Sequence, residues 1–344
     1  MTTPTTTPPI DEKPTTAARL APFGETIFTP ITALAVKHKA INLGQGFPDF
    51  EGPAFIRGAA IEAMNAGHNQ YAPMYGIPPL REAIADWFAA AAGFRPDPDV
   101  AVTVTSGCTE AIPAAILGLI EPGDEVILFE PYYDSYPACL SMAGAAPKFV
   151  TLRPPDFAFD PDELAAAFSS KTRAVIVNTP HNPTGKVYAR KELELIAELC
   201  QKHDCLAITD EVYERLVFDG EHIPLASIDG MRARTVTLSS LGKTFSFTGW
   251  KIGWAVASPA LTRAVRAAHQ YLTFATATPL QHGAVAALRA PQSYFDDFVS
   301  GYRRKRDRLV DGLADIGFTV TPPAGSYFVL ADHTPFGFED DRAF

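Results

Sequence analysis

An acid and an amine that follow two predicted strands could act together in this chain. Asp210 comes directly after the apolar run Leu206–Thr209, and Lys243 lies just past the later run Thr235–Leu238. In an open α/β sheet, ligands bind beyond the carboxyl ends of the strands, so we expect both side chains to point into one crevice. A lysine held there beside other cations and away from bulk water has its ammonium form disfavoured, which makes it a nucleophilic amine able to form a Schiff base.

A buried carboxylate can do the complementary work. It can keep a heterocyclic nitrogen protonated, and a protonated pyridine is the electron sink used in pyridoxal phosphate chemistry. Taken alone, a strand-end aspartate such as Asp210 is more often a cap or turn residue, and a single lysine is usually solvent-exposed. A functional role for Asp210 and Lys243 therefore needs support from the rest of the sequence.

An NTPase is the first alternative to consider. Gly242-Lys243-Thr244 resembles the end of a P-loop, but the glycine that this motif needs five positions before Gly242 is Thr237. The run before Asp210-Glu211 resembles a Walker B strand, yet it precedes the lysine, which reverses the usual order. Both departures disfavour nucleotide hydrolysis. The patterns G-x-S-x-G, H-E-x-x-H and G-x-G-x-x-G are also absent from the sequence.

The elements that would position these residues alternate between short β-branched runs and helical patterns from about residue 52 to residue 290. This rhythm is typical of βαβ units around a mostly parallel sheet. Helices are predicted, for example, over Thr109–Leu119 and Arg190–His203. The predicted strands are Val100–Thr105, Glu125–Phe129, Lys148–Leu152, Ala174–Asn178, Leu206–Thr209, Thr235–Leu238 and Gly253–Ala257.

The chain ends differ in character from this region. Gln292–Asp315 has the pattern of a charged amphipathic helix, and Phe318–Val320 and Tyr327–Leu330 resemble a strand pair. We predict a disordered tail over residues 1–18, an N-terminal segment of a small domain over 19–51, a large domain over 52–290 and the rest of the small domain over 291–344.

Composition favours a globular protein that handles small molecules. The 344 residues are 47% apolar and 20% charged, with a formal net charge of −10. This acidic balance argues against nucleic acid or an anionic membrane as the main partner. The four cysteines lack the spacing of a structural zinc site. Because the first residues have no apolar stretch before a cleavage site, we expect a cytoplasmic protein.

Seven motifs, in order along the chain, carry a resemblance to a known family. They are Asn42-Leu-Gly-Gln-Gly-Phe-Pro-Asp-Phe50, Gln70-Tyr-Ala-Pro-Met-Tyr-Gly76, Thr105-Ser-Gly-Cys-Thr-Glu-Ala111, Glu130-Pro-Tyr-Tyr-Asp134, Asn178-Thr-Pro-His-Asn-Pro-Thr-Gly185, Thr209-Asp-Glu-Val-Tyr213 and the segment Ser240–Trp254. With these motifs the chain resembles a class I aminotransferase of pyridoxal-phosphate (PLP) fold type I, in the branch of the kynurenine, glutamine and methionine enzymes. The resemblance implies an α/β fold with a mostly parallel seven-stranded sheet between helices, and a smaller α+β domain built from both chain ends.

The resemblance also implies a cofactor site. Lys243 would attach PLP and move the proton between the substrate Cα and the cofactor, and Asp210 would pair with the pyridine nitrogen. Tyr213 would join them in catalysis by binding the ring oxygen. The phosphate would lie on Gly107–Thr109, where a helix N-terminus suits an anion. The complete implied shell is Gly107, Cys108, Thr109, Tyr133, Asn182, Asp210, Tyr213, Ser240, Lys243 and Lys251.

Substrate contacts follow from the same resemblance. Gly46 would offer a backbone N–H to the substrate carboxylate, and Asn182 would reach the same group. Phe28 and Phe274 would line the side-chain pocket, and Tyr71 would reach across from the neighbouring subunit of a homodimer. The substrates would be an α-amino acid, aromatic or methionine or glutamine, and a 2-oxo acid, without metal, nucleic acid or membrane.

Two alternatives stay open at this point. A carbon–sulfur β-lyase uses the same lysine and electron sink but expels a β-substituent, and a homologue could bind the cofactor without turnover. After Gly325–Leu330 the family continues to an arginine that binds the substrate α-carboxylate, whereas this sequence stops at Phe344. We therefore expect an incomplete chain that binds PLP but transaminates poorly.

Overall fold

The computed structural model describes residues 16–44, 46, 48, 50–341 and 344. The chain divides into two compact units, one ending at Gly44 and the other spanning Gln45–Phe344. In the first unit, helix α1 covers Phe28–His38. The predicted disordered tail, residues 1–18, lies mostly outside the described residues, and the predicted boundaries near residues 52 and 290 stay predictions.

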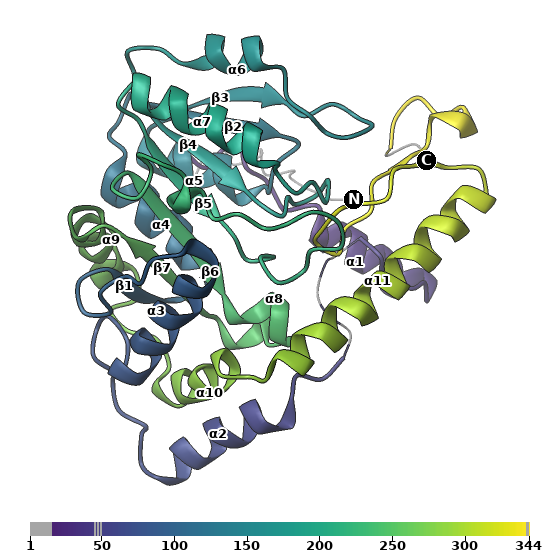
Figure 1. Cartoon of the computed structure of the whole chain (residues 1–344). Helices are drawn as coiled ribbons and strands as arrows, with labels where there is room; N and C mark the ends of the chain where they lie inside the picture. The colour runs from purple at the N-terminus through teal and green to yellow at the C-terminus, as the bar shows by residue number, and fades with distance from the viewer. Residues whose placement is uncertain (1–15, 45, 47, 49, 342–343) are drawn as a thin grey trace, which may run out of the picture. The chain divides into compact units, whose positions relative to one another are not determined.

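A seven-stranded sheet forms the centre of the second unit (Figure 1). The strands lie in the order β1-β7-β6-β5-β4-β2-β3, and β7 alone runs against the others. This confirms the predicted α/β class and the mostly parallel sheet. The strands are β1 Val102–Ser106, β2 Glu125–Glu130, β3 Ala146–Thr151, β4 Thr172–Asn178, β5 Leu206–Asp210, β6 Thr235–Ser240 and β7 Ile252–Ala257.

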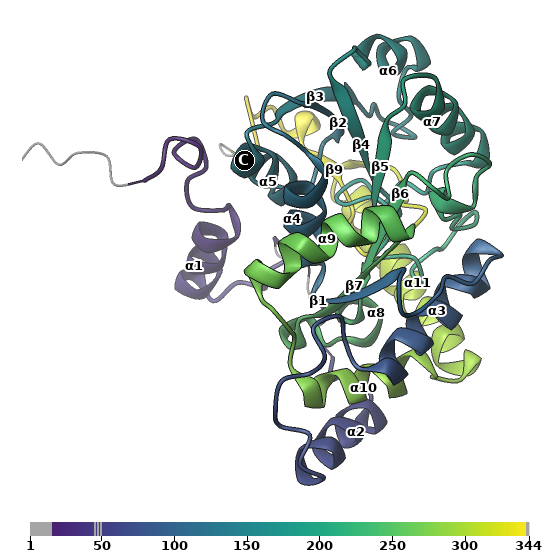
Figure 2. The ribbon, with the colours of Figure 1, turned by 90° about the vertical axis from the view of Figure 1, so that its left-hand side faces the viewer.

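Helices cover the sheet because its strands carry apolar side chains on both faces. In β2, Val126 and Leu128 pack into a core with α4, α5 and α9, whereas Ile127 and Phe129 pack into a core with α6 and α7. Figure 2 shows α9 lying across the sheet beside α4. The helices of this unit are α2 Ala54–Asn65, α3 Pro78–Ala92, α4 Cys108–Leu119, α5 Ser135–Ala143, α6 Pro161–Ala167, α7 Arg190–Lys202, α8 Leu241–Phe245, α9 Pro259–Leu272, α10 Thr278–Leu288 and α11 Gln292–Asp315.

The carboxyl ends of the strands gather the residues that matter for chemistry. In parallel register, Asn178 at the end of β4 faces Asp210 at the end of β5. Because β7 is antiparallel, its first residues also lie at this edge, where Ser240 pairs with Gly253 and Ser106 pairs with Ile252. Residues that follow β1, β4, β5 and β6 therefore meet residues that precede β7.

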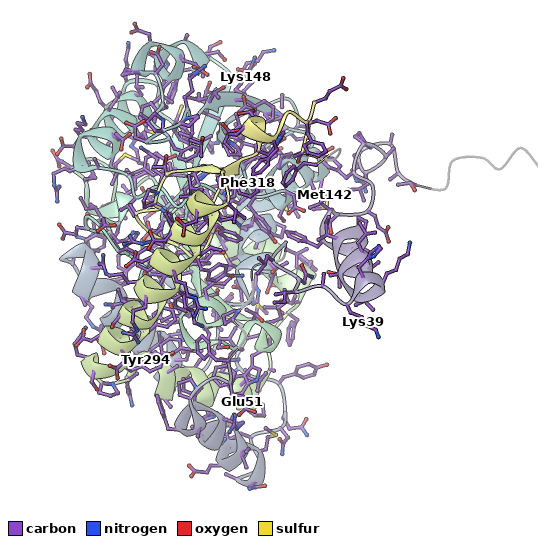
Figure 3. All side chains as sticks on the ribbon, turned by 90° about the vertical axis from the view of Figure 1, so that its right-hand side faces the viewer. Lys39, Glu51, Met142, Lys148, Tyr294 and Phe318 are labelled. Carbon is purple, nitrogen blue, oxygen red and sulfur yellow. The ribbon has the colours of Figure 1, made fainter. Side chains whose placement is uncertain are left out.

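The C-terminal region begins with the long helix α11, which runs between Tyr294 and Phe318 in Figure 3. The predicted strand pair is half correct. Thr319–Val320 forms β8, but its partner β9 is Ala331–Asp332 and not Tyr327–Leu330. Tyr327 lies outside the strands, and its hydroxyl donates to the Gly46 carbonyl and accepts from Lys243. None of the described helices is long and apolar enough to cross a membrane.

Candidate active site

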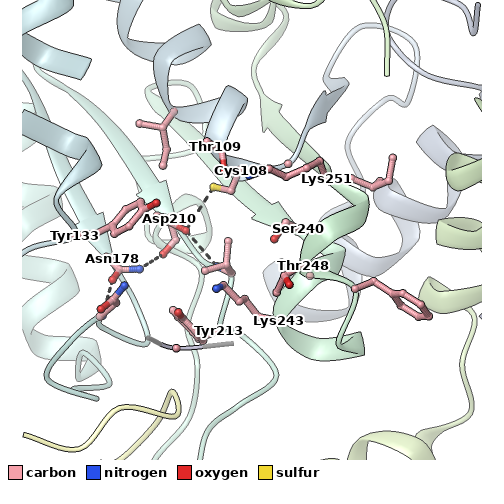
Figure 4. Close-up of a pocket in the computed structure, with 18 residues that line it drawn as sticks. Cys108, Thr109, Tyr133, Asn178, Asp210, Tyr213, Ser240, Lys243, Thr248 and Lys251 are labelled. Atoms are coloured by element: carbon pink, nitrogen blue, oxygen red, sulfur yellow. Dashed lines mark hydrogen bonds between the residues drawn. The ribbon is translucent and has the colours of Figure 1, made fainter. Parts of the chain in front are cut away.

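A cavity of about 340 Å³ opens at the carboxyl edge of the sheet. Figure 4 shows Asp210 deep in it, with Lys251 and Thr109 at another side. Every residue of the predicted cofactor shell lines this cavity, and so does Gly46; the lining residues are Gly46, Gly107, Cys108, Thr109, Ile112, Tyr133, Asn178, Asn182, Asp210, Val212, Tyr213, Ser240, Gly242, Lys243, Phe247, Thr248, Lys251 and Ile252.

Asp210 is a buried anion held by neutral donors. The Tyr136 hydroxyl donates to its Oδ2 at 2.8 Å, and the Val212 N–H and the Cys108 thiol donate to its Oδ1 at 3.4 and 3.6 Å. Burial raises the pKa of the Asp210 carboxyl, and these hydrogen bonds oppose that rise. A cation at the centre of the cavity would therefore find a preformed, desolvated counter-charge.

The Lys243 amine lies in the same cavity. Its Nζ donates to the Tyr327 hydroxyl at 3.0 Å, and that hydroxyl donates to the Gly46 carbonyl at 2.6 Å. Nζ is 5.9 Å from the centre of the Tyr213 ring. Burial raises the pKa of Tyr213 well above its usual value, so its phenol stays protonated.

The cup that faces Lys251 is built from the start of helix α4. Gly107 precedes this helix with φ of +70°, a left-handed conformation that glycine adopts without strain. A Cβ on Gly253 of β7 would come within 2.5 Å of the Gly107 carbonyl carbon, so a glycine at this position lets the strand approach the cup. Lys251 Nζ donates to Thr109 Oγ1 at 2.8 Å. A helix N-terminus with a lysine beside it suits a phosphate.

Asn178, at the end of β4, links Asp210 at the end of β5 to Asn182 in the segment after β4. The Asn178 amide donates to the Asp210 main-chain oxygen at 2.8 Å and accepts from the Asn182 N–H at 2.6 Å. Sequence reasoning missed Asn178, Tyr136 and Tyr327 as site residues. Tyr136 lies three residues after Tyr133, which is the only signal that could have pointed to it.

The predicted substrate residues divide into two groups. Gly46 and Asn182 line the cavity. Tyr71 and Phe274 are not among its lining residues. Their rings contact each other edge-to-face, with ring centres 5.5 Å apart, and the two residues are 83% and 44% exposed. Phe28 begins α1 in the other unit, which is described by itself. The roles of these three in substrate binding stay predictions.

PLP fits the donor set of this cavity. The buried Asp210 carboxylate would face the pyridine nitrogen, Lys243 would meet the aldehyde carbon, and the cup at Gly107–Thr109 with Lys251 would hold the phosphate. When bound, PLP withdraws electron density from a substrate Cα, which makes the proton there removable. The protein supplies the fixed anion, the amine and the phosphate anchor.

Comparisons with known proteins show the family of this chain. The family model for aminotransferase class I and II matches residues 38–341. A probable N-succinyldiaminopimelate aminotransferase, DapC, of Mycobacterium tuberculosis is 48% identical over 96% of this chain and 84% of its own length. Methionine aminotransferase of Escherichia coli is 42% identical over 95% of this chain and 85% of its own length.

Solved structures of aminotransferases are also similar to this chain. The M. tuberculosis N-succinyldiaminopimelate aminotransferase has a TM-score of 0.93 over 95% of this chain and 86% of its own, at 48% identity. The E. coli methionine aminotransferase structure has a TM-score of 0.92 over 95% and 86%, at 42% identity. The fold and the site define a PLP-dependent enzyme of fold type I. Within that class, the chain belongs to the class I and II aminotransferases, whose substrates are amino acids and 2-oxo acids.

Proposed function

We propose that this aminotransferase carries its cofactor on Lys243 and takes a large, uncharged α-amino acid as amino donor. The observation that supports the first part is the shared cavity, in which the Lys243 amine, the buried Asp210 carboxylate and the Lys251 cup occupy different sides. Lys243 would hold the cofactor covalently, and its free amine would move a proton at the substrate Cα.

The remaining cavity residues hold the cofactor in place. Tyr213 and Asn182 would donate to the ring oxygen, and Tyr133 would cover the pyridine face. The backbone at Gly107–Thr109 and the side chains of Thr109, Ser240 and Lys251 would hold the phosphate. The buried Asp210 side chain would keep the pyridine nitrogen protonated, because bulk water does not screen a charge there.

The donor class follows from the charges of the cavity. Among the residues that line it, Lys243 and Lys251 are the cations, and both are committed to the cofactor. A distal carboxylate on the donor would therefore be desolvated without a partner. The methionine aminotransferase and the kynurenine transaminases among the relatives support an uncharged donor, such as methionine, an aromatic amino acid or glutamine.

N-succinyldiaminopimelate is the second candidate donor, because the probable N-succinyldiaminopimelate aminotransferase is 48% identical to this chain over 332 residues. This compound carries carboxylates far from the reacting amine. It therefore needs a partner for those charges in the outer part of the site, whereas an uncharged donor does not. A side-by-side assay therefore separates them.

We also propose that the working form is a homodimer. Tyr71 and Phe274 present an exposed aromatic pair, and Tyr71 of one subunit would complete the cavity of its partner. Exposed aromatic surface of this kind is typical of interfaces. Sedimentation velocity of the wild type and Tyr71→Asp tests this proposal, and a monomeric wild type with full activity overturns it.

A cytoplasmic location, expected from the sequence, is tested by cell fractionation.

Borohydride reduction of the holoenzyme, followed by peptide mapping, tests the Lys243 assignment. The pyridoxyl mass is expected on the peptide that contains Lys243. Label on Lys251 or on another lysine would end the assignment.

Ranking donors by kcat/KM tests the substrate class. Phenylalanine and methionine are expected above aspartate and above N-succinyldiaminopimelate, with 2-oxo acid formation that depends on an added acceptor. Aspartate or the succinylated compound at the head of the ranking would show that a cation outside the cavity lining serves the distal carboxylate. Acceptor-independent release of pyruvate and thiol from S-substituted cysteines would instead identify the β-lyase.

A further inference from the structure

A buried ion pair lies directly behind the phosphate cup. Glu110 is in the first turn of α4, next to Thr109, and its Oε1 is 2.6 Å from Nδ1 of His269 on α9. The side chains of Glu110 and His269 are 5% and 0% exposed. The other oxygen of Glu110 accepts from the Ser106 N–H, at the end of β1. The carboxylate thus fixes the strand–helix turn that forms the cup.

The hydrogen bond at Nε2, the second ring nitrogen of His269, determines the charge of the ring. Nε2 lies 2.8 Å from the Met74 carbonyl, and a carbonyl only accepts, so Nε2 carries a hydrogen. With Nδ1 donating to Glu110, His269 is an imidazolium. Burial alone lowers the pKa of His269, but the hydrogen bond and charge of Glu110 outweigh burial and raise it; Arg266, on the same helix, opposes this rise.

The pair reaches the segment that carries Tyr71. Besides the bond from His269 to Met74, Arg266 of α9 stacks over the Tyr75 ring at 3.7 Å. Thr273 Oγ1 donates to Glu110 Oε1 at 2.7 Å, one residue before Phe274. Helix α9 and the Thr273 that follows it therefore link Met74, Tyr75 and the residue before Phe274 to the first turn of α4.

We propose that Glu110 and His269 form a positioning pair that couples the phosphate cup to the exposed Tyr71–Phe274 aromatic edge. Neither residue lines the cavity; both act through the turn at Ser106–Thr109 and through the Met74 carbonyl. Strength of phosphate binding and order of the aromatic edge then depend on one ion pair. This inference rests on the proposed function, because it takes the α4 N-terminus as the phosphate site.

Titration of the apoenzyme with PLP and with pyridoxal, which lacks the phosphate, tests the coupling. In Glu110→Gln and His269→Gln, PLP affinity is expected to fall about tenfold, as for a residue that modulates a site without touching the ligand. Pyridoxal affinity should stay within about twofold, because no phosphate is held in either protein. In the double variant the loss should not exceed that of the singles, since both remove the same interaction.

His222→Gln is the matched control. His222 also forms a buried pair with a glutamate, Nε2 to Glu211 Oε2 at 2.9 Å, but away from the cup. This variant should leave the ratio of PLP to pyridoxal affinity unchanged. Hydrogen exchange adds a readout independent of the cofactor: His269→Gln should speed exchange in residues 70–77 and 106–112, whereas His222→Gln should speed it near residues 211–222.

The outcomes separate this inference from the proposed function. If wild-type protein binds PLP no better than pyridoxal, the phosphate site itself is misplaced. If wild type prefers PLP and the Glu110 and His269 variants keep that preference, or if exchange in residues 70–77 does not change, the positioning pair is wrong. Equal losses of PLP and pyridoxal affinity would also overturn it, because they indicate general destabilisation.

Discussion

The two ends of the cofactor cavity are built on opposite principles. Around Asp210 the protein buries a carboxylate and surrounds it with neutral donors from two helices, α4 and α5, and from the loop after β5. Around Lys251 it places an exposed cation beside a helix N-terminus. A buried charge acts strongly on a neighbouring ring because water does not screen it, whereas an exposed charge mainly anchors a ligand. We therefore expect the first end to govern turnover and the second to govern affinity.

The loss of Lys243 should produce the largest effect. If Lys243 both holds the cofactor and carries the proton, as proposed, transamination by Lys243→Ala is expected to fall by about ten thousandfold, the upper range for a lost acid–base group. Single-turnover measurements with saturating PLP give the rate. A variant within tenfold of wild type would mean that another group moves the proton.

Asp210→Asn tests the buried end alone. It keeps the shape but removes the charge, and kcat is expected to fall about a hundred- to a thousandfold, as when one preorganised electrostatic group is lost. The dissociation constant of PLP should change by less than about tenfold. Asp219→Asn, at an exposed carboxylate paired with Arg303 and Arg306, is the control and should leave kcat unchanged. A larger effect on affinity than on kcat would contradict the comparison.

Lys251→Met tests the exposed end. Losing a hydrogen bond from a charged donor should weaken PLP binding about ten- to a hundredfold. At saturating PLP, kcat should stay within about threefold of wild type. The wild-type affinity should also fall with added salt, because an exposed charge is screened. If kcat of Lys251→Met falls in proportion to its PLP affinity, the Lys251 end also governs turnover, which contradicts the comparison.

The smallest effect should come from the ion pair behind the cup. The raised pKa of His269 means that its contribution to stability is complete below the unfolded value of about 6.5 and is lost as the pH rises through the folded pKa. The difference in free energy of unfolding between wild type and His269→Gln should therefore shrink as the pH is raised above neutrality. Urea titrations at several pH values measure it, and a difference that grows with pH would contradict the imidazolium assignment.

All seven strands of the sheet were predictable from short β-branched and apolar runs, most of which are buried on both faces; the edge strand β3 is largely exposed. The direction of β7 was not predictable, since an apolar run looks the same whichever way it points. The family resemblance had placed Lys251 and Thr109 in one shell, and the direction of β7 explains how they meet at the start of that strand.

The cofactor shell was predicted from motifs, and each of its members lines the cavity. Tyr136 and Asn178 were missed because their contributions are made through Asp210, by contacts between residues 32 and 74 positions apart. Tyr327 was read as a strand residue, because alternating apolar residues indicate a strand whether or not an aromatic side chain has a polar partner inside the protein. Local patterns report burial well, but they do not identify the second residue of a long-range pair.

The hydrogen-bond chain from Lys243 through Tyr327 to Gly46 has a consequence for how the protein is made. Its outer link joins residues 281 positions apart. Contacts of such long sequence separation form late, because closing the loop costs entropy before the contact repays it. During synthesis the amine of Lys243 therefore emerges well before its hydroxyl partner. The nascent chain therefore passes through a stage in which Lys243 has been made but the hydroxyl that accepts its hydrogen bond has not.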